Sequence, residues 1–408
     1  MEVLTKYAVK DFLNALQLGS KIDRQLDKTN VFSGKTGATA KIRRPLQFDT
    51  SEGAEITAGQ ITDIEEGTIT MTLNERHKTV IAIKSQDMTL NVDRLRELYI
   101  KPQMVQLAQL VETKIAQQYK YLPNFIGTPG TSPATFLDVG AAYAKLISLG
   151  VPDDGRLMGF YGPNECLTLA NGLKAVFPND ISKKAIENAK IGRYGNISLY
   201  NNQSLAMHTV GVNTGTPLVK LAAQNVTYAT AKDTWTQTLN TQGWTASKTG
   251  ILKAGDVFTL ALVYAVNRRT KQSTGDLQQF VVTADANSDI SGDSTLTISP
   301  PIITSGPYQT VTVAPANNAP ITVQTDVPGT GGTVHRQNLI LHPDAITMAM
   351  VPLELPEGGV MATRVDYENI SIRMVKQYDI SLDQTIWRCD ILFGLKAQNP
   401  EWAVRATS

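Results

Sequence analysis

The feature that most constrains the fold is a change of pattern near residue 214. Between residues 214 and 334 no helical periodicity occurs, and short apolar runs rich in Thr and Val alternate with turns rich in Gly, Pro and Asn. Short strands at regular spacing are typical of a small β-barrel or β-sandwich. The pattern predicts a β-domain inserted into an α+β domain, whose chain resumes near residue 335. The apolar runs include GDVFTLALVYAV, LQQFVVTADA, DSTLTISPPII and YQTVTVAP.

Before this block lies the clearest predicted helix, over residues 92–121. Apolar side chains such as Met104, Ala108 and Val111 recur at steps of three or four residues, which is the spacing of one helix face. Pro102 lies inside the pattern. Because proline lacks an N–H donor and clashes with the preceding turn, we predict a kink or a break there. Further helices are predicted at 135–149 and 179–192.

Residues 38–84 are predicted to form a long two-stranded hairpin that runs into a sheet. The first arm, ATAKIRRPLQF, reads as extended, and Pro45 keeps it away from the middle of a sheet. After a turn-rich stretch, the second arm alternates Thr with apolar residues in TITMTL, as a half-buried strand does. The first arm carries the basic pair Arg43-Arg44. The acidic residues opposite are Glu52, Glu55, Glu65 and Glu66.

Just before the hairpin, Gly34-Lys35-Thr36 spells the last three letters of a phosphate-binding loop. That loop needs a further glycine five residues before its Gly-Lys pair, and a helix directly after it. The required position holds Thr29, and an extended segment follows. We therefore predict no nucleotide binding. Gly34 and Gly37 instead allow the chain to turn into the hairpin, and with Pro102 they are the candidate hinges.

The opposite charges of the hairpin have two explanations, and both stay open. The side chains pair across the hairpin itself, or they dock against complementary charge on a neighbouring subunit. An isolated two-stranded hairpin is only marginally stable, so an external support is expected. The candidate subunit-interface residues are Lys35, Arg43, Arg44, Glu52, Glu55, Glu65 and Glu66.

The sequence contains no pattern that predicts catalysis or metal binding. The histidines lack the spacing of metal ligands, and no nucleophile elbow is present. Cys166 and Cys389 lie in apolar contexts and are predicted to be small buried residues. We predict no enzyme activity, no cofactor and no metal. The four histidines are His77, His208, His335 and His342.

Charge and hydropathy exclude two further classes of partner, specifically bound nucleic acid and membranes. The net charge is +1, which excludes a strongly basic nucleic-acid-binding protein and leaves only non-specific contact with packaged nucleic acid. No apolar run is long enough to cross a membrane, and the N-terminus lacks the pattern of a secretion signal. The two cysteines indicate a reducing cytosol.

Taken in order, these elements resemble the major capsid proteins of tailed bacteriophages, which have the Hong Kong 97 capsid fold. Among them, the chain is most similar to the coat proteins of Salmonella podophages, which carry an inserted β-barrel domain. The resemblance covers nearly the whole chain. Its clearest stretches are GATAKIRRPLQF, SEGAEITAGQITDIEEGTITMTLNERHKTV, SQDMTLNVDRLRELYIKP, FYGPNE, LKAGDVF and ILHPDAITMAMVPLELPEGG.

The resemblance implies an α+β capsid fold in six segments. These are an N-terminal arm (1–32), an E-loop hairpin with peripheral-domain strands (33–84), a spine helix with the rest of the peripheral domain (85–134), the first part of an axial domain (135–213), the inserted β-barrel (214–334) and a closing axial and peripheral part (335–408).

The resemblance also implies a structural function. The chain would be a major capsid protein that self-assembles, as hexamers and pentamers, into the icosahedral head shell around double-stranded DNA. The implied partners are further copies of the chain, a scaffolding protein, a portal protein and DNA bound non-specifically, with no membrane. The implied location is the virion, after assembly in the host cytoplasm. The alternative, a non-enzymatic phage tail or adhesin component, follows from the β-rich block but leaves the long helix and the hairpin unexplained.

Overall fold

A computed structural model describes residues 2–26, 39–48, 65–86, 96–173, 192–194, 196–326, 331–358 and 360–407. The chain divides into two compact units, each built from separate stretches of sequence. Unit 1 consists of residues 1–41, 70–116 and 346–396, and unit 2 of residues 42–69, 117–345 and 397–408. Each unit therefore depends on contacts between residues far apart in the chain, which lengthens the search during folding.

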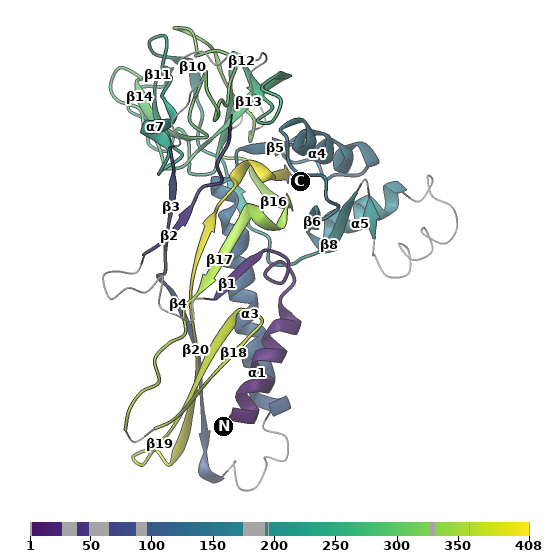
Figure 1. Cartoon of the computed structure of the whole chain (residues 1–408), viewed down its shortest axis with the longest axis vertical. Helices are drawn as coiled ribbons and strands as arrows, with labels where there is room; N and C mark the ends of the chain where they lie inside the picture. The colour runs from purple at the N-terminus through teal and green to yellow at the C-terminus, as the bar shows by residue number, and fades with distance from the viewer. Residues whose placement is uncertain are drawn as a thin grey trace, which may run out of the picture. The chain divides into compact units, whose positions relative to one another are not determined.

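Unit 1 contains a six-stranded sheet with the order β1-β17-β20-β19-β18, in which β4 also pairs with β20 (Figure 1). On β20, Trp387, Cys389 and Ile391 are buried at alternate positions, and the polar Asp390 between two of them is buried as well. The apolar residues have the period of two expected when one face of a strand meets a core. The strands are β1 (Asp23–Leu26), β4 (Glu75–Lys84), β17 (Ile346–Met350), β18 (Met361–Tyr367), β19 (Ile370–Asp379) and β20 (Gln384–Ala397).

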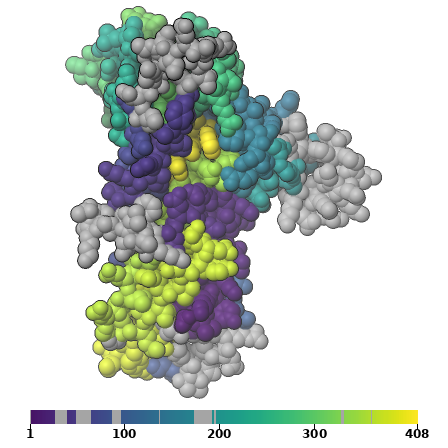
Figure 2. Space-filling model, viewed as in Figure 1, coloured from purple at the N-terminus to yellow at the C-terminus, as the bar shows by residue number. Residues whose placement is uncertain are grey.

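The N-terminal helix α1 (Glu2–Ala15) packs against β18, β19 and helix α3 (Lys101–Ala116). Figure 2 shows these N-terminal residues, in purple, against the yellow-green strands. After α1, the backbone N–H groups of Gln17, Leu18 and Gly19 donate to the carboxylate of Glu112 at 2.8–3.0 Å. The buried Glu112 thus satisfies a turn that would otherwise leave three donors unpaired.

A long helix is predicted at 92–121. The structure describes residues 96–121 of it, and these form three successive helical segments of different type. A π-helical turn, η2 (Arg96–Ile100), precedes α3, and a 3-10 helix, η3 (Gln117–Tyr121), comes next in the chain and belongs to unit 2. Pro102 is the second residue of α3, and because it has no N–H it cannot donate a hydrogen bond to a carbonyl of the preceding helical turn. The kink or break predicted there coincides with the change from π to α geometry, while a hinge at Pro102 stays a prediction.

Unit 2 contains a seven-stranded mixed sheet with the order β5-β21-β16-β6-β8-β7, in which β9 also pairs with β16. Buried Leu146 of α4 and Leu169 of α5 share a core with Val404 of β21. The elements are β5 (Asn124–Ile126), α4 (Phe136–Ser148), β6 (Met158–Tyr161), α5 (Pro163–Leu173), β7 (Arg193–Tyr194), β8 (Ile197–Asn201), β9 (Met207–Thr209), β16 (Val334–Leu341), η4 (Pro343–Ala345), η5 (Pro400–Trp402) and β21 (Ala403–Thr407).

The helix predicted at 135–149 is confirmed as α4. The helix predicted at 179–192 falls outside the described residues, apart from its last residue.

The β-rich block forms the second sheet of unit 2, with the order β10-β11-β14-β13-β12-β15. All neighbouring strands in it are antiparallel, and Leu239, Phe258 and Phe280 lie in its own core. One short helix, α7 (Tyr228–Ala231), interrupts the block. The α+β class predicted from the sequence is confirmed, while the limits 214 and 334 stay a prediction. The strands are β10 (Gly215–Val219), β11 (Gln237–Trp244), β12 (Val257–Val266), β13 (Ser273–Val282), β14 (Ser294–Ser299) and β15 (Ile321–Val323).

Candidate functional site

The predicted hairpin is described over residues 39–48 and 65–72, and in it β2 (Thr39–Arg43) pairs with β3 (Thr68–Thr72) as a two-stranded sheet. Four candidate interface residues lie in the described part: Arg43, Arg44, Glu65 and Glu66. The other candidates lie outside it, namely the interface residues Lys35, Glu52 and Glu55 and the hinge residues Gly34 and Gly37.

Arg43 pairs across the hairpin. Its Nη1 lies 3.6 Å from Oε1 of Glu66, and the two side chains are 81% and 50% exposed. An ion pair this exposed contributes about 1 kcal/mol or less. Internal pairing, the first explanation of the hairpin charges, therefore occurs here but holds the hairpin only weakly. Contact of Arg43 with a neighbouring subunit stays a prediction.

Arg44 has a different environment from its neighbour. Its guanidinium carbon lies 4.5 Å from the ring centroid of Trp235, and its Nε donates to the carbonyl of Lys232 at 3.2 Å. Burial lowers the pKa of Arg44, and the carboxylate of Glu401 partly offsets that effect. Arg44, predicted as an interface residue, is thus bound within its own unit.

The Trp235 ring is also in contact with a second guanidinium. Arg268 lies 4.9 Å from its centroid, and the indole N–H donates to Oε1 of Glu401 at 2.9 Å. The same Oε1 accepts a hydrogen bond from Arg268 at 2.5 Å. Trp235 is buried, with a φ of 57°. A bulky residue in the left-handed region is uncommon and costs roughly 1–3 kcal/mol.

Two stacked tyrosines contact the residues that follow Arg44 on the first arm of the hairpin. The rings of Tyr228 and Tyr308 are parallel, with centroids 3.6 Å apart. The Tyr308 hydroxyl donates to the carbonyl of Pro45 at 3.3 Å and accepts from the N–H of Gln47 at 3.2 Å. A Cβ on Gly67 would lie 2.6 Å from the Tyr228 hydroxyl oxygen, so only glycine fits at that position.

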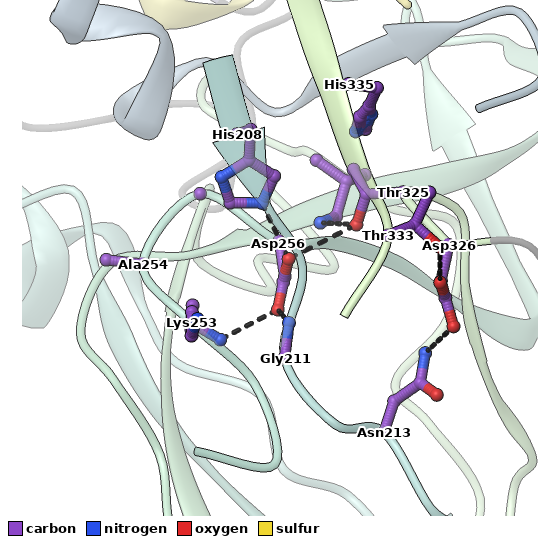
Figure 3. A network of polar contacts seen from close by, with 12 residues as sticks. His208, Gly211, Asn213, Lys253, Ala254, Asp256, Thr325, Asp326, Thr333 and His335 are labelled. Atoms are coloured by element: carbon purple, nitrogen blue, oxygen red, sulfur yellow. Dashed lines mark hydrogen bonds and ion pairs between the residues drawn. The ribbon is translucent and has the colours of Figure 1, made fainter. Parts of the chain in front are cut away.

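A second polar cluster links the two sheets of unit 2 (Figure 3). Asp256, just before β12, accepts hydrogen bonds from Nε2 of His208 on β9 at 2.7 Å and from the Thr325 hydroxyl at 3.4 Å. Its other oxygen accepts from the N–H groups of Gly211 at 3.0 Å and Lys253 at 2.7 Å. Nδ1 of His208 lies 3.0 Å from the Tyr119 hydroxyl. Each oxygen of the fully buried Asp256 thus has two donors.

A neighbouring carboxylate joins the two ends of the β-rich block. Asp326 accepts hydrogen bonds from Asn213 at 2.8 Å, from the N–H of Gly331 at 3.0 Å and from the Thr333 hydroxyl at 2.6 Å (Figure 3). Asn213 precedes β10, the first strand of the β-rich sheet, whereas Thr333 follows β15, its last strand, and leads into β16. The chain therefore enters and leaves the β-rich sheet at one hydrogen-bonded point.

Two basic side chains, His335 and Arg405, lie behind this cluster. Burial, followed by the nearby His208 and Arg405, lowers the pKa of His335 to about 4. Burial also lowers the pKa of Arg405 to about 10. The Arg405 Nη1 donates to the Gly255 carbonyl at 2.8 Å, and its guanidinium lies 5.6 Å from the Tyr119 ring centroid. The buried hydrogen bonds of Asp256 and Arg405 thus join the seven-stranded sheet to the β-rich sheet.

The described residues carry little that suggests chemistry on a substrate. Burial raises the pKa of the Cys166 thiol to about 11 and that of Cys389 to about 12, so both thiols are protonated at neutral pH and are poor nucleophiles. Within the described ranges, no group of three His, Cys, Asp or Glu side chains has the arrangement of a metal site. No helix in those ranges is long and apolar enough to span a membrane.

The family model of the P22 coat protein (gene protein 5) matches residues 1–405. The chain belongs to the P22 coat protein family. A major capsid protein of Acyrthosiphon pisum secondary endosymbiont phage 1 is 26% identical over 415 residues, covering 98% of this chain and 95% of the relative.

Two solved structures are also similar to the chain. The CUS-3 coat protein I-domain is 26% identical, covers 31% of this chain and all of that domain, and has a TM-score of 0.18. A structure from Mycobacterium phage Che8 is 10% identical, covers 97% of this chain and 90% of its own, and has a TM-score of 0.45.

As a member of the P22 coat protein family, the chain is a phage major capsid protein, the subunit that forms the capsid shell. The family, the function and the Hong Kong 97-type fold predicted from the sequence are thereby confirmed. The tail or adhesin alternative is not favoured, because the match includes both units and the hairpin. The family is a structural one, which is consistent with the predicted lack of enzyme activity.

Proposed function

We propose that copies of this P22-type coat protein form the hexamers and pentamers of an icosahedral head, guided by a scaffolding protein and completed by a portal protein. Assembly takes place in the host cytoplasm, and double-stranded DNA is then packaged without sequence preference. The observation that carries the proposal is the family match over residues 1–405. The net charge of +1 agrees with a shell that does not grip DNA strongly.

Co-expression with the scaffolding protein of the same phage tests this proposal. The expected product is a population of closed particles of uniform size, seen by electron microscopy and as one fast-sedimenting species. Omitting the scaffolding protein should give fewer and irregular particles. A chain that stays monomeric under every assembly condition would contradict the proposal.

A charge swap separates the two explanations of the hairpin charges. If Arg43 contacts a neighbouring subunit, Arg43→Glu should lower the yield of closed particles about tenfold while leaving the unassembled chain folded. The double variant Arg43→Glu with Glu66→Arg restores the pair seen within the hairpin. We expect it to assemble as poorly as the single variant, measured by sedimentation of co-expressed particles. Full recovery in the double variant would show that pairing inside the hairpin is what matters. The candidates Lys35, Glu52, Glu55 and Glu65 are proposed to act at the same subunit contact.

We also propose that residues 214–334 are an inserted domain that folds by itself. Its sheet has a separate core, and Asp326 joins the two ends of the block. Expressed alone, this segment is expected to give the dispersed amide spectrum of a β-protein in NMR. A collapsed spectrum would refute these limits.

A further inference from the structure

The base of the hairpin is seated on a surface formed by residues of the β-rich block and the C-terminal stretch of unit 2. Arg44 stacks on Trp235, and Trp235 is bonded in turn to Glu401. We define the hairpin base as residues 44–48 and 65–68, and the post as Tyr228, Asp233, Trp235 and Tyr308. All of these residues belong to unit 2.

The contacts hold both arms of the hairpin base. On the first arm, Gln47 donates its N–H to the Tyr308 hydroxyl at 3.2 Å. On the second arm, Thr68 donates its N–H and its hydroxyl to Oδ1 of Asp233 at 2.9 and 2.8 Å. The two arms are joined by the N–H of Arg44 and the Gly67 carbonyl at 2.9 Å. The post therefore fixes the hairpin base at several separate points.

The chemistry of the post favours control of orientation over simple burial. A guanidinium over the face of an indole is attracted by the ring's π-system, an attraction that an aliphatic side chain at the same position would lack. Two guanidinium groups, of Arg44 and Arg268, lie over the one Trp235 ring, and Arg268 is also ion-paired with Glu401. Trp235 also keeps a left-handed backbone conformation, and such conformations persist where the surrounding structure demands them.

We propose that Trp235 is a positioning residue for assembly: it clamps Arg44, and thereby sets the direction in which the hairpin leaves unit 2 toward a neighbouring subunit. The clamp itself is a property of the unassembled chain. Its use in shell formation rests on the proposed function.

Hydrogen exchange on the unassembled full-length chain tests the clamp. In Arg44→Ala, the amides of Gln47 and Thr68 should exchange about tenfold faster, because the stacking and the adjacent hydrogen bonds are lost. Core amides at Phe258 and Phe280 should be unchanged. Trp235→Phe keeps an aromatic face and should stay near the wild type. Arg43→Ala is the matched control, since Arg43 is exposed and pairs only with Glu66 among the described residues.

Co-expression with scaffolding protein then tests the use of the clamp. Arg44→Ala should lower the yield of closed shells about tenfold. Arg44→Lys keeps a positive charge that can lie over the Trp235 ring, and it should restore the yield of closed shells to about a third of the wild-type yield. Equal exchange at Gln47 and Thr68 in Arg44→Ala and Arg43→Ala would overturn the clamp. Faster exchange together with normal shells would overturn its role in positioning.

Two further measurements allow the clamp to be tested even if Arg44→Ala disturbs the core or the wild-type chain forms no shells. If Arg44→Ala also loosens Phe258 and Phe280, Arg44→Lys replaces it, and the expected rise in exchange at Gln47 is about threefold. If the Gln47 amide of Arg44→Lys exchanged at the wild-type rate, the clamp would be overturned. If the wild-type chain itself forms no shells, the proposed function fails while the exchange result still judges the clamp.

Discussion

Replacing Asp256 with alanine is expected to lower the free energy of unfolding of unit 2 by about 4 kcal/mol. The carboxylate is fully buried and receives four hydrogen bonds, from His208, Thr325, Gly211 and Lys253. Its removal leaves a buried imidazole nitrogen and two backbone N–H groups without an acceptor. Each such group costs about 1–3 kcal/mol. Denaturant unfolding of the unassembled chain, followed by tryptophan fluorescence, measures the loss.

Asp285 provides the matched control for this experiment. It is an exposed carboxylate that accepts one hydrogen bond, from the N–H of Ala254 at 2.8 Å. Asp285→Ala is expected to cost about 1 kcal/mol or less. Should Asp256→Ala fail to fold, Asp256→Asn keeps the shape of the side chain and should lose about 2 kcal/mol. Equal effects of Asp256→Ala and Asp285→Ala would show that the buried cluster does not hold the sheets together.

Acid should destabilise unit 2 through His335. Burial, His208 and Arg405 lower the pKa of this imidazole to about 4, although Asp256 and Asp326 act in the opposite direction. The unfolded chain binds the proton near pH 6.5, so protonation favours unfolding. The contribution of His335 is therefore complete above pH 6.5 and is lost as the pH falls from 6.5 to 4. The shift corresponds to about 3 kcal/mol of unfolding free energy.

His335→Gln should remove this pH dependence. The free energy of unfolding, measured by urea titration at pH 7.5 and at pH 4, should differ between the two pH values by about 3 kcal/mol less in the variant than in the wild type. His77→Gln, which changes a histidine of unit 1, should keep the wild-type difference. If the free energy of unfolding of His335→Gln changed between pH 7.5 and pH 4 as much as that of the wild type, another group would dominate acid unfolding.

The parts of the fold with a local signal could be predicted from the sequence. The recurrence of Met104, Ala108 and Val111 predicts a helix because helical spacing depends only on near neighbours. Pro102 marks a change of helix type for the same local reason. The loss of helical periodicity after residue 214 predicts the β-rich sheet. A short helix such as α7 (Tyr228–Ala231) has too few residues to give a periodic signal.

The contacts of the site could not be predicted, because they join residues far apart in the chain. Arg44 and Trp235 are separated by the whole of unit 1's helix α3 and much of unit 2, and nothing near Arg44 distinguishes it from Arg43. In the structure Arg43 is exposed and Arg44 is stacked on an indole. The sequence favoured equal roles for two arginines whose environments differ.

The buried cluster was missed for a related reason. His208 and His335 lack the spacing of metal ligands and so resemble background histidines. Asp256 lies in AGDVF, which reads as an ordinary turn before a strand. Only the pairing of β9 with β16 brings His208 beside His335. A buried Asp–His pair supported by two backbone amides has no signature in a single sequence.

A cryo-electron microscopy reconstruction of particles from co-expression with scaffolding protein would show whether this chain builds a capsid shell. We predict a closed icosahedral shell built from this P22-type coat protein, with the hairpin of one copy in contact with the next copy near Arg43. Rings, fibres or isolated chains in place of closed shells would contradict it.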